Sequence, residues 1–443
     1  NAEEFGIIAA TNVVIMFVQM LSEAGVGSVL VQRENIDKQL IAAAMHLSLL
    51  IGIIFTGVII VSADLIEVFF DINNLALYVK ALSISFIFVA LYKIPESILQ
   101  REMKFDVLMK LNLVSYLLGF VTPALYLGIN GFGVWSLVIA SLGQIVVKVI
   151  VLNIAKSVKV FKKVTWNTYK DVLGFGAGVT SIRIWSYFYR QGDRLVLGRI
   201  MSVEQLGEYH LANQLSFLPG QYVGNVIDSV LFPVMSRLRQ DKEKLSQLLV
   251  VSQMLALYCM TALGLFLSIF GKDIVQLVYG GQWSSIVVIF QVLCLGAGVR
   301  SATRMSDITN RALGRLKAAS ASKFLSALFF ISSVYYASSI GLKEVSFAVL
   351  ASNIIALILA STVSMVNINV QLRMVIISLI KVLSCCGVIF ILFNELYIQS
   401  IIAFEDLLIR LLIVTPLGIF ITFSIGYLVY RKDVIKLRHS VFD

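Results

Sequence analysis

Long apolar runs separated by short polar stretches form the dominant pattern along the chain. Most runs reach the roughly 20 residues with which an α-helix crosses a hydrocarbon core of about 30 Å. The short alternating segments of membrane β-barrels are not seen. The sequence therefore predicts an all-α polytopic membrane protein with thirteen spans, at about residues 6–33, 39–62, 78–99, 109–128, 131–154, 172–200, 206–236, 246–270, 284–304, 316–340, 344–367, 371–394 and 407–430.

The composition agrees with this class. Of the 443 residues, 58% are hydrophobic and only 14% are charged, whereas soluble domains carry about 25% charged residues. The mean hydropathy of +0.89 fits a chain whose solvent is mostly lipid. All four cysteines lie in apolar runs without a Cys-x-x-Cys pair, so neither disulfides nor a zinc site are predicted.

The net charge of +10 could suggest a nucleic-acid partner, but the positions of the basic residues argue against it. Alternating spans place the basic loops and the tail on one face, and acidic residues such as Asp64 and Glu395 on the other. The basic face is the cytoplasmic one, so we expect both termini of the intact chain in the cytoplasm. The residues concerned are Arg101, Lys104, Lys110, Lys156, Lys159, Lys162, Lys163, Lys170, Arg237, Arg239, Lys242, Lys244, Arg311, Arg315, Lys317, Arg431, Lys432, Lys436 and Arg438.

Two pairs of matching stretches predict an internal duplication. NAEEFGIIAATN at residues 1–12 aligns without a gap with SVEQLGEYHLAN at 202–213, and LQREMKF at 99–105 corresponds to TNRALGR at 309–315. Six helices per copy would give both copies the same orientation, as in transporters built from parallel repeats. Because the helix at 172–200 precedes the second copy, we expect a matching helix before the first and fourteen spans in the intact protein.

The predicted organisation follows from this duplication. Residues 1–154 form an N-terminal bundle that lacks its first helix, and residues 155–171 form a basic cytoplasmic linker. Residues 172–367 form the C-terminal bundle, and residues 368–443 add a helix pair with a basic cytoplasmic tail. All loops are short, which leaves no room for a soluble domain.

Arginines inside the predicted spans are the first candidate site. Arg183, Arg190 and Arg194 are spaced i, i+7, i+11, which places them on one helical face. A buried arginine costs at least about 2.5–3.5 kcal/mol, so three on one face are expected to line a water-filled cavity. There they would bind an anion such as a diphosphate, and Arg300 would extend the same positive surface.

Structural roles are the alternative for the same residues. Arg190 and Asp193, at i, i+3, would form an ion pair, and Arg194 would extend its side chain to the outer interface.

Glu208, His210 and Asp228, in the next predicted span, are the candidates for ion coupling. A carboxylate near a histidine binds and releases a proton near neutral pH, and a carboxylate with backbone carbonyls binds Na⁺. Pairing with neighbouring arginines is an equally strong alternative. His46 and Lys80 are weaker candidates.

Glycines and prolines punctuate the two helices that the duplication makes equivalent: Gly25, Gly27, Pro219, Gly220, Gly224 and Pro233. Small residues allow helices to approach closely, and proline permits bending. No phosphate-binding G-x-x-x-x-G-K-[ST] loop, nucleophile elbow or metal-spaced cluster occurs. We therefore expect a protein that is not an enzyme and has no cofactor, driven by an H⁺ or Na⁺ gradient or by removal of product.

Several of these stretches carry a family resemblance. RQGDRLVLGRIMSVEQLGEYHLANQLSFLPGQY at 190–222, LFPVMSRL at 231–238, EEFGIIAATN, GVGSVLVQ and LQREMKF resemble the polysaccharide transporter family. That family contains flippases of lipid-linked oligosaccharides and belongs to the MOP superfamily, with the MATE drug exporters and the lipid II flippases. The chain departs from the family in lacking the first helix.

The resemblance implies a flippase of the bacterial inner membrane. It would move undecaprenyl-diphosphate-linked repeat units to the periplasmic leaflet by alternating access, for O-antigen, capsule or exopolysaccharide synthesis. Its partners would be the lipid-linked oligosaccharide, the bilayer and a polysaccharide polymerase, without nucleic acid, and we expect a monomer. The rival hypotheses are a cation-coupled drug exporter, whose cationic substrates an arginine-rich cavity would repel, a membrane-embedded polymerase or glycosyltransferase, and a non-transporting scaffold.

Overall fold

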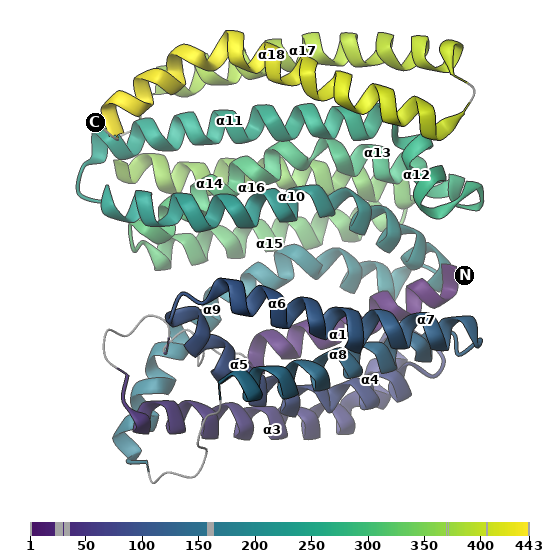
Figure 1. Cartoon of the computed structure of the whole chain (residues 1–443), viewed down its shortest axis with the longest axis vertical. Coiled ribbons are helices and arrows are strands. Elements are labelled where there is room, and N and C mark those ends of the chain that lie inside the picture. The colour runs from purple at the N-terminus through teal and green to yellow at the C-terminus, as the bar shows by residue number, and fades with distance from the viewer. Residues whose placement is uncertain are drawn as a thin grey trace. The chain divides into compact units, whose positions relative to one another are not determined.

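The computed structural model describes residues 2–22, 30, 36–156, 164–368, 370, 372–404 and 406–441. Every regular element within these ranges is a helix, and none of them is a strand (Figure 1). Ten helices among the described residues are long and apolar enough to cross a membrane. The predicted class, an all-α polytopic membrane protein, is therefore confirmed, whereas thirteen spans here and fourteen in the intact protein stay predictions.

The chain divides into two compact units, Asn1–Gly207 and Glu208–Asp443. The bundle and linker boundaries expected near residues 154, 171 and 367 stay predictions. Residues Gly25 and Gly27, and the lysines at 159, 162 and 163, lie outside the described ranges.

The first unit contains the helices α1 (Ala2–Ser22), α3 (Lys38–Phe70), α4 (Leu75–Ser83), α5 (Ser85–Arg101), α6 (Phe105–Tyr116), η1 (Leu117–Val121), α7 (Thr122–Ile129), α8 (Val134–Ala155) and α9 (Trp166–Ile200). Polar contacts connect α9 to two of the others. The Tyr187 hydroxyl donates to the Val13 carbonyl of α1, and the Tyr169 hydroxyl lies 2.8 Å from Nδ1 of His46 on α3. His46 therefore has a structural partner.

A proline and a buried polar cluster lie next to each other in this unit. Pro95 lies inside α5 and lacks the N–H that would bond the Leu91 carbonyl four residues earlier. The Asn153 amide of α8 donates to that carbonyl at 3.3 Å. Beside it, Glu96 is 7% exposed and bonds both Lys93 at 3.1 Å and Lys148 at 2.8 Å. A buried carboxylate with two ammonium partners satisfies the requirement that charges in an apolar interior be paired.

Another acidic residue joins the ends of two helices. Glu102, just after α5, pairs with Lys104 at 2.8 Å and with Lys156 at the end of α8. Hydrogen bonds from Lys104 and Lys156 hold the pKa of the Glu102 carboxyl below its ordinary value. This carboxylate therefore stays ionised, and both pairs persist, at neutral pH.

The second unit holds most of α10 (Val203–Arg237), then α11 (Lys242–Ile269), α12 (Gly271–Tyr279), η2 (Gly281–Ile286), α13 (Val287–Leu295), α14 (Ala297–Ala312), α15 (Leu316–Ser338), α16 (Leu342–Ile368), α17 (Leu372–Ala403) and α18 (Leu407–Val441). A polar contact fixes its centre. The Gln253 amide of α11 donates to Ser306 of α14 at 3.1 Å and to Ser361 of α16 at 2.8 Å. Three helices are therefore held in one register.

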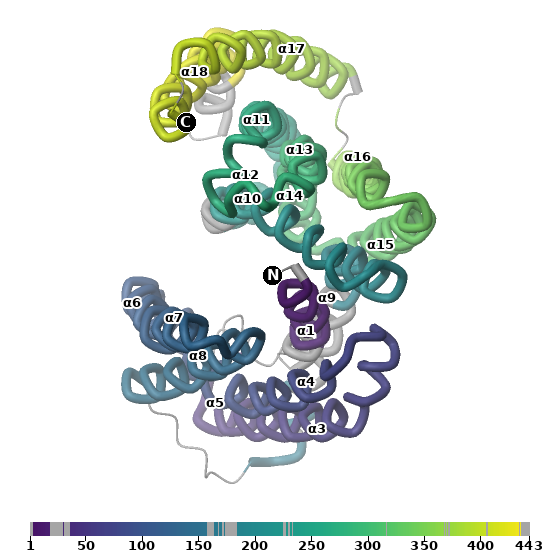
Figure 2. Tube along the Cα trace, turned by 90° about the vertical axis from the view of Figure 1, so that its right-hand side faces the viewer, coloured from purple at the N-terminus to yellow at the C-terminus, as the bar shows by residue number. Residues whose placement is uncertain are grey.

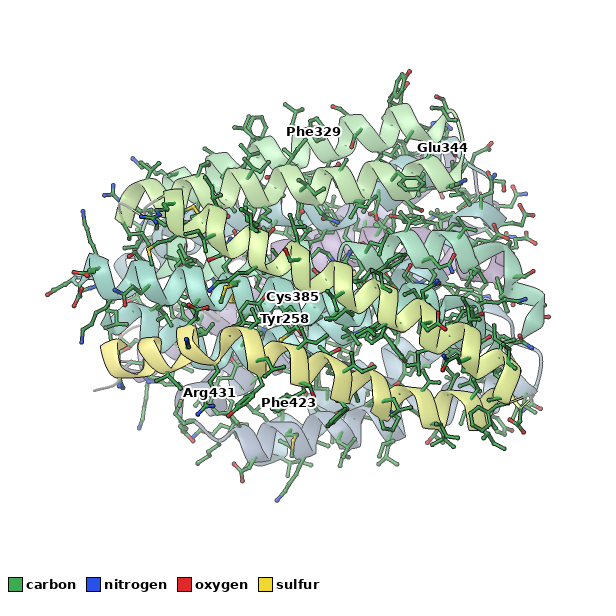
Figure 3. The ribbon with its side chains drawn as sticks, turned by 90° about the horizontal axis from the view of Figure 1, so that it is seen from above. Tyr258, Phe329, Glu344, Cys385, Phe423 and Arg431 are labelled. Carbon is green, nitrogen blue, oxygen red and sulfur yellow. The ribbon has the colours of Figure 1, made fainter. Side chains whose placement is uncertain are left out.

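The last two helices, α17 and α18, run over α11 (Figure 2). Tyr258 of α11 and Cys385 of α17 lie close together between α17 and α18 in the view of Figure 3, in an apolar cluster with Phe393 and Tyr430. A buried ion pair adds to this contact, since Arg410 of α18 bonds Asp273 of α12 at 3.0 Å. Their side chains are only 12% and 6% exposed.

Breaking this buried pair should cost far more than breaking an exposed one. We expect Arg410→Met to destabilise the protein by about 3 kcal/mol, because Asp273 would stay buried without its partner. Lys104→Met is the control, because Lys104 lies between two candidate spans, is 54% exposed and leaves Glu102 its second partner Lys156, so its pair should contribute less than about 1 kcal/mol. Chemical unfolding in detergent measures both, and equal effects would contradict this account.

The same turn closes α5 and α14. The Lys104 N–H bonds the Leu99 carbonyl at 3.0 Å, and the Arg315 N–H bonds the Asn310 carbonyl at 3.1 Å. This is the 6→1 bond of a helix end closed by a left-handed residue. The left-handed residues are Met103 and Gly314, with φ of 57° and 68°. The two turns therefore correspond as the duplication predicts, but one residue out of register with the sequence match of 99–105 to 309–315.

Substitutions at these two turns should have opposite effects. An added Cβ at Gly314 would meet nothing within 4 Å, so Gly314→Ala should cost only the backbone strain of about 1 kcal/mol. Met103→Gly removes that strain and should stabilise the protein by about 0.5–1 kcal/mol. Thermal unfolding in detergent compares the two variants. Stability changes of the same sign in both would refute the left-handed conformation at these two positions.

Candidate functional site

Three arginines on one face of α14 contact α10 within the second unit. Arg300, Arg304 and Arg311 are spaced i, i+4, i+11, which brings them onto one side of a helix. Their partners on α10 are Phe217, Asp228 and Phe232, also at helical spacing. The result is a row of guanidinium groups along the line where α14 faces α10.

The centre of the row is a two-point ion pair. Nε of Arg304 bonds one oxygen of Asp228 at 3.0 Å, and Nη2 bonds the other at 3.1 Å. Nη2 of Arg311 lies 3.6 Å from the same carboxylate. Two parallel bonds to a carboxylate are the strongest geometry available to a guanidinium. One carboxylate therefore contacts two arginines.

A glycine allows this pair to form. A Cβ at Gly224 would lie 1.9 Å from Nη1 of Arg304, well inside any real contact distance. Gly224 precedes Asp228 by one helical turn, so the arginine lies over the glycine and reaches the carboxylate beyond it. The expected close approach at this glycine is thus made by a side chain rather than by a second helix backbone.

Aromatic rings hold the outer members of the row. The guanidinium of Arg300 lies 4.2 Å from the ring centre of Phe217, and its Nη1 donates to the Leu293 carbonyl at 3.1 Å. The guanidinium of Arg311 lies 5.5 Å from the ring of Phe232. Contact with an aromatic face stabilises a cation without neutralising it. These rings therefore help to position the two guanidinium groups.

The side chains of the row are not fully covered by protein. The Arg304 and Asp228 side chains are 29% and 31% exposed, and Arg311 is 48% exposed. On the neighbouring side of α14, Asp307 pairs with Lys323 of α15 at 2.6 Å. Asp307 is thereby paired with Lys323, whereas Asp228 contacts Arg304 and Arg311 of the row.

The α9 arginines lie in the first unit. Arg183 lies within α9 but its side chain is outside the described set, while Arg190 is exposed. Nη1 of Arg194 donates to Gln191 at 2.7 Å, and Asp193 is buried and accepts from the Arg194 backbone N–H. Arg300 belongs to the second unit, so a common cavity for all four arginines stays a prediction.

The ion-coupling candidates have separate surroundings. Glu208 accepts a hydrogen bond from Ser285 at 2.6 Å, and His210 is buried, 8% exposed. Asp228 is the one that takes arginine partners, as the structural alternative expected, although these come from α14. Lys80 pairs with the exposed Asp64 at 2.7 Å. No group of three metal-binding side chains occurs among the described residues.

Sequence reasoning missed Arg304 as a site residue and treated Arg311 only as a loop charge. The signal was present, because Arg300, Arg304 and Arg311 share one helical face and α14 is strongly polar for a membrane helix. The predicted span ended at residue 304, which placed both residues at the membrane boundary instead of on one continuous helix.

A family model described as polysaccharide biosynthesis protein matches residues 1–288. The chain belongs to the polysaccharide biosynthesis protein family. Among curated relatives, it is 26% identical over 306 residues to the lipopolysaccharide biosynthesis protein WzxC of Escherichia coli, covering 67% of this chain and 61% of that protein. It is 25% identical over 303 residues to the succinoglycan biosynthesis transport protein ExoT of Rhizobium meliloti, covering 68% and 60%. The match thus spans about three fifths of these relatives' length.

Solved structures show the same fold. The lipid II flippase MurJ, in an inward closed conformation, superposes with a TM-score of 0.71 at 16% identity, over 98% of this chain and 94% of that one. An inward-facing MATE family multidrug transporter of the MOP superfamily gives 0.71 at 16% identity, over 83% and 91%. The predicted MOP superfamily fold is therefore confirmed, and the chain is a multi-pass membrane protein.

Two glycines on α10 test the packing of the arginine row. Gly224→Ala should destabilise the protein by about 1–3 kcal/mol, because the new methyl group collides with Arg304. Gly220→Ala is the matched control: its Cβ would meet only Met260 Cε at 3.7 Å, so the better helix propensity of alanine should leave stability unchanged or raised.

Thermal unfolding of the two variants in detergent gives the comparison. In an Arg304→Ala background the cost of Gly224→Ala should disappear. A cost that persists there would show that Gly224 serves another contact.

Proposed function

We propose that this protein is a flippase that moves undecaprenyl-diphosphate-linked oligosaccharide repeat units from the cytoplasmic to the periplasmic leaflet of the bacterial inner membrane. The product would serve O-antigen, capsule or exopolysaccharide assembly. The observation that carries the proposal is the row of guanidinium groups along α14, in which Arg304 and Arg311 both contact Asp228. Family membership and the flippase fold agree with it.

The chemistry of the diphosphate explains why arginine is used. A guanidinium donates two parallel hydrogen bonds to phosphate oxygens, and it stays charged in an apolar environment. Keeping such charges in a membrane span costs at least about 2.5–3.5 kcal/mol each, so they require a compensating role. Binding the head group of a lipid whose tail remains in the bilayer supplies that role.

Transport would proceed by alternating access, with the α14 arginines binding the diphosphate on the cytoplasmic side and releasing it on the other. Arg183, Arg190 and Arg194 of α9 stay predicted substrate contacts within the first unit. Glu208 and His210 are the candidates for H⁺ or Na⁺ coupling, since Asp228 is engaged by arginines. Both termini of the intact chain would face the cytoplasm, and the protein would act as a monomer beside a polysaccharide polymerase.

The alternatives fit the site less well. A drug exporter of similar fold would present cationic substrates to a row of arginines, which would repel them. A membrane-embedded polymerase or glycosyltransferase would be expected to carry an acidic catalytic pair or a large extramembrane loop. Four acidic side chains of the described helices instead pair with basic side chains: Asp228, Asp307, Glu96 and Asp273.

The test is leaflet assignment of the lipid-linked repeat unit in cells that carry variants at matched protein levels. Arg304→Ala should slow translocation by about 10–100-fold, the loss expected for one charge-assisted bond worth about 1.5–3 kcal/mol. The repeat unit would accumulate on the cytoplasmic leaflet. The control is Arg431→Ala, because that arginine lies on α18 over Tyr427 and outside the row.

Two results would contradict the proposal. Normal translocation by Arg304→Ala would remove the row from the mechanism. Unpolymerised units on the periplasmic leaflet of cells lacking the protein would show that translocation is intact, and would favour a polymerase or ligase.

A further inference from the structure

We propose that Asp228 is an internal substitute for the substrate's phosphate, which occupies the Arg304 guanidinium in the empty site and gives it up when the diphosphate binds. This inference rests on the proposed function and adds a residue that sets how tightly the substrate is held. Asp228 thereby acts as a competing anion rather than as an ion-coupling group.

The geometry of the pair supports the substitution. A carboxylate and a phosphate both accept two parallel hydrogen bonds from a guanidinium. Asp228 takes Nε and Nη2 of Arg304 at 3.0 and 3.1 Å, which is the two-point geometry that a phosphate would use. The same donors serve either anion, so the two must compete.

The other edge of the guanidinium offers less room. Nη1 of Arg304 lies so close to α10 that a Cβ at Gly224 would be 1.9 Å away. A phosphate that sought this edge would meet the backbone of α10. The edge that Asp228 occupies is therefore the one through which Arg304 presents two donors.

Exchange is physically accessible from this state. The Asp228 carboxylate is 31% exposed, so an incoming anion reaches the pair. Arg311 lies 3.6 Å from the same carboxylate, a looser contact that keeps Asp228 compensated once Arg304 is taken. Losing both partners would leave a charge in a span without compensation and would cost several kcal/mol.

A competing carboxylate also serves the transport cycle. A diphosphate diester carries about two negative charges, and Asp228 places a further negative charge beside Arg304 and Arg311. Without Asp228 the diphosphate would meet no competing anion at Arg304 and would be held more tightly. Asp228 thus lowers affinity and favours release, which a flippase without ATP hydrolysis requires.

The test is calorimetric titration of the purified protein in detergent with farnesyl diphosphate as the probe. Asp228→Asn keeps the size of the side chain but removes the competing charge, and should lower Kd about tenfold, as expected if the competent form is about one tenth populated in the parent. Asp307→Asn is the matched control, because it removes one negative charge from α14, the helix that carries the arginine row, whereas the partner of Asp307 is Lys323. Its Kd should change by less than about twofold.

The outcomes separate the inference from the proposed function. If Asp228→Asn and Asp307→Asn lower Kd equally, the effect is general electrostatic attraction and the role of Asp228 is overturned. An unchanged Kd for Asp228→Asn would also overturn it. Arg304→Ala should weaken binding at least tenfold. If Arg304→Ala binds like the parent protein, the site of the proposed function is wrong whatever Asp228 does.

A second measurement covers the case in which Asp228→Asn does not fold. Infrared difference spectra of the parent protein, taken on adding farnesyl diphosphate, should show a shift of one aspartate carboxylate stretch as its partner changes. The shift should persist in Asp307→Asn. A spectrum without a carboxylate shift would overturn the inference.

Discussion

The pair of Arg304 with Asp228 is the interaction on which the candidate site depends. An isolated charge in a membrane span is expensive, so a partner there stabilises it. Glu96 has two lysines, and Asp273 has Arg410. These clusters connect helices to one another. The α14 row differs because two of its arginines share one carboxylate, and because Arg300 lies against the ring of Phe217.

Small residues and helix breaks make such pairs compatible with close helix packing. Gly224 lets Arg304 lie against α10, and Asn153 replaces the hydrogen bond that Pro95 removes from α5. Gly119 of η1 lets α8 approach until a Cβ would be 2.5 Å from the Cα of Gln144. Polar groups are thus paired at the positions where the backbone permits approach, and the apolar faces remain for lipid and for helix packing.

The sequence determined the helices far better than it determined the site. Apolar runs of membrane length locate helices directly, because no other element satisfies backbone polar groups in lipid. The site depends on which helices face each other, and spacing along one helix does not contain that information. Asp228 was therefore interpreted as an ion-coupling residue, since its partners are 76 and 83 positions further along the chain.

The predicted span at 284–304 ends eight residues before the end of α14 because polar residues enter the helix there. Hydropathy falls where Arg304 and Asp307 enter α14, so a hydropathy reading ends the span there, although the helix continues to Ala312. Burial of Ser306, Thr309 and Asn310 against α11 and α16 allows this polar turn to stay helical and packed. The duplicated turn was found from LQREMKF and TNRALGR, but its register required the hydrogen bonds at Lys104 and Arg315.

The central claim is that a diphosphate is what the arginine row recognises and carries across the membrane. The most direct measurement is translocation in liposomes containing the purified protein, with any residues that its gene encodes beyond this sequence. Two fluorescent glycolipids would be compared, one with the oligosaccharide on a prenyl diphosphate and one with the same sugar on a neutral linkage. The account predicts that the protein moves the diphosphate-linked lipid well above empty liposomes and leaves the neutral one behind. Equal transport of both lipids, or transport of the neutral lipid alone, would contradict it.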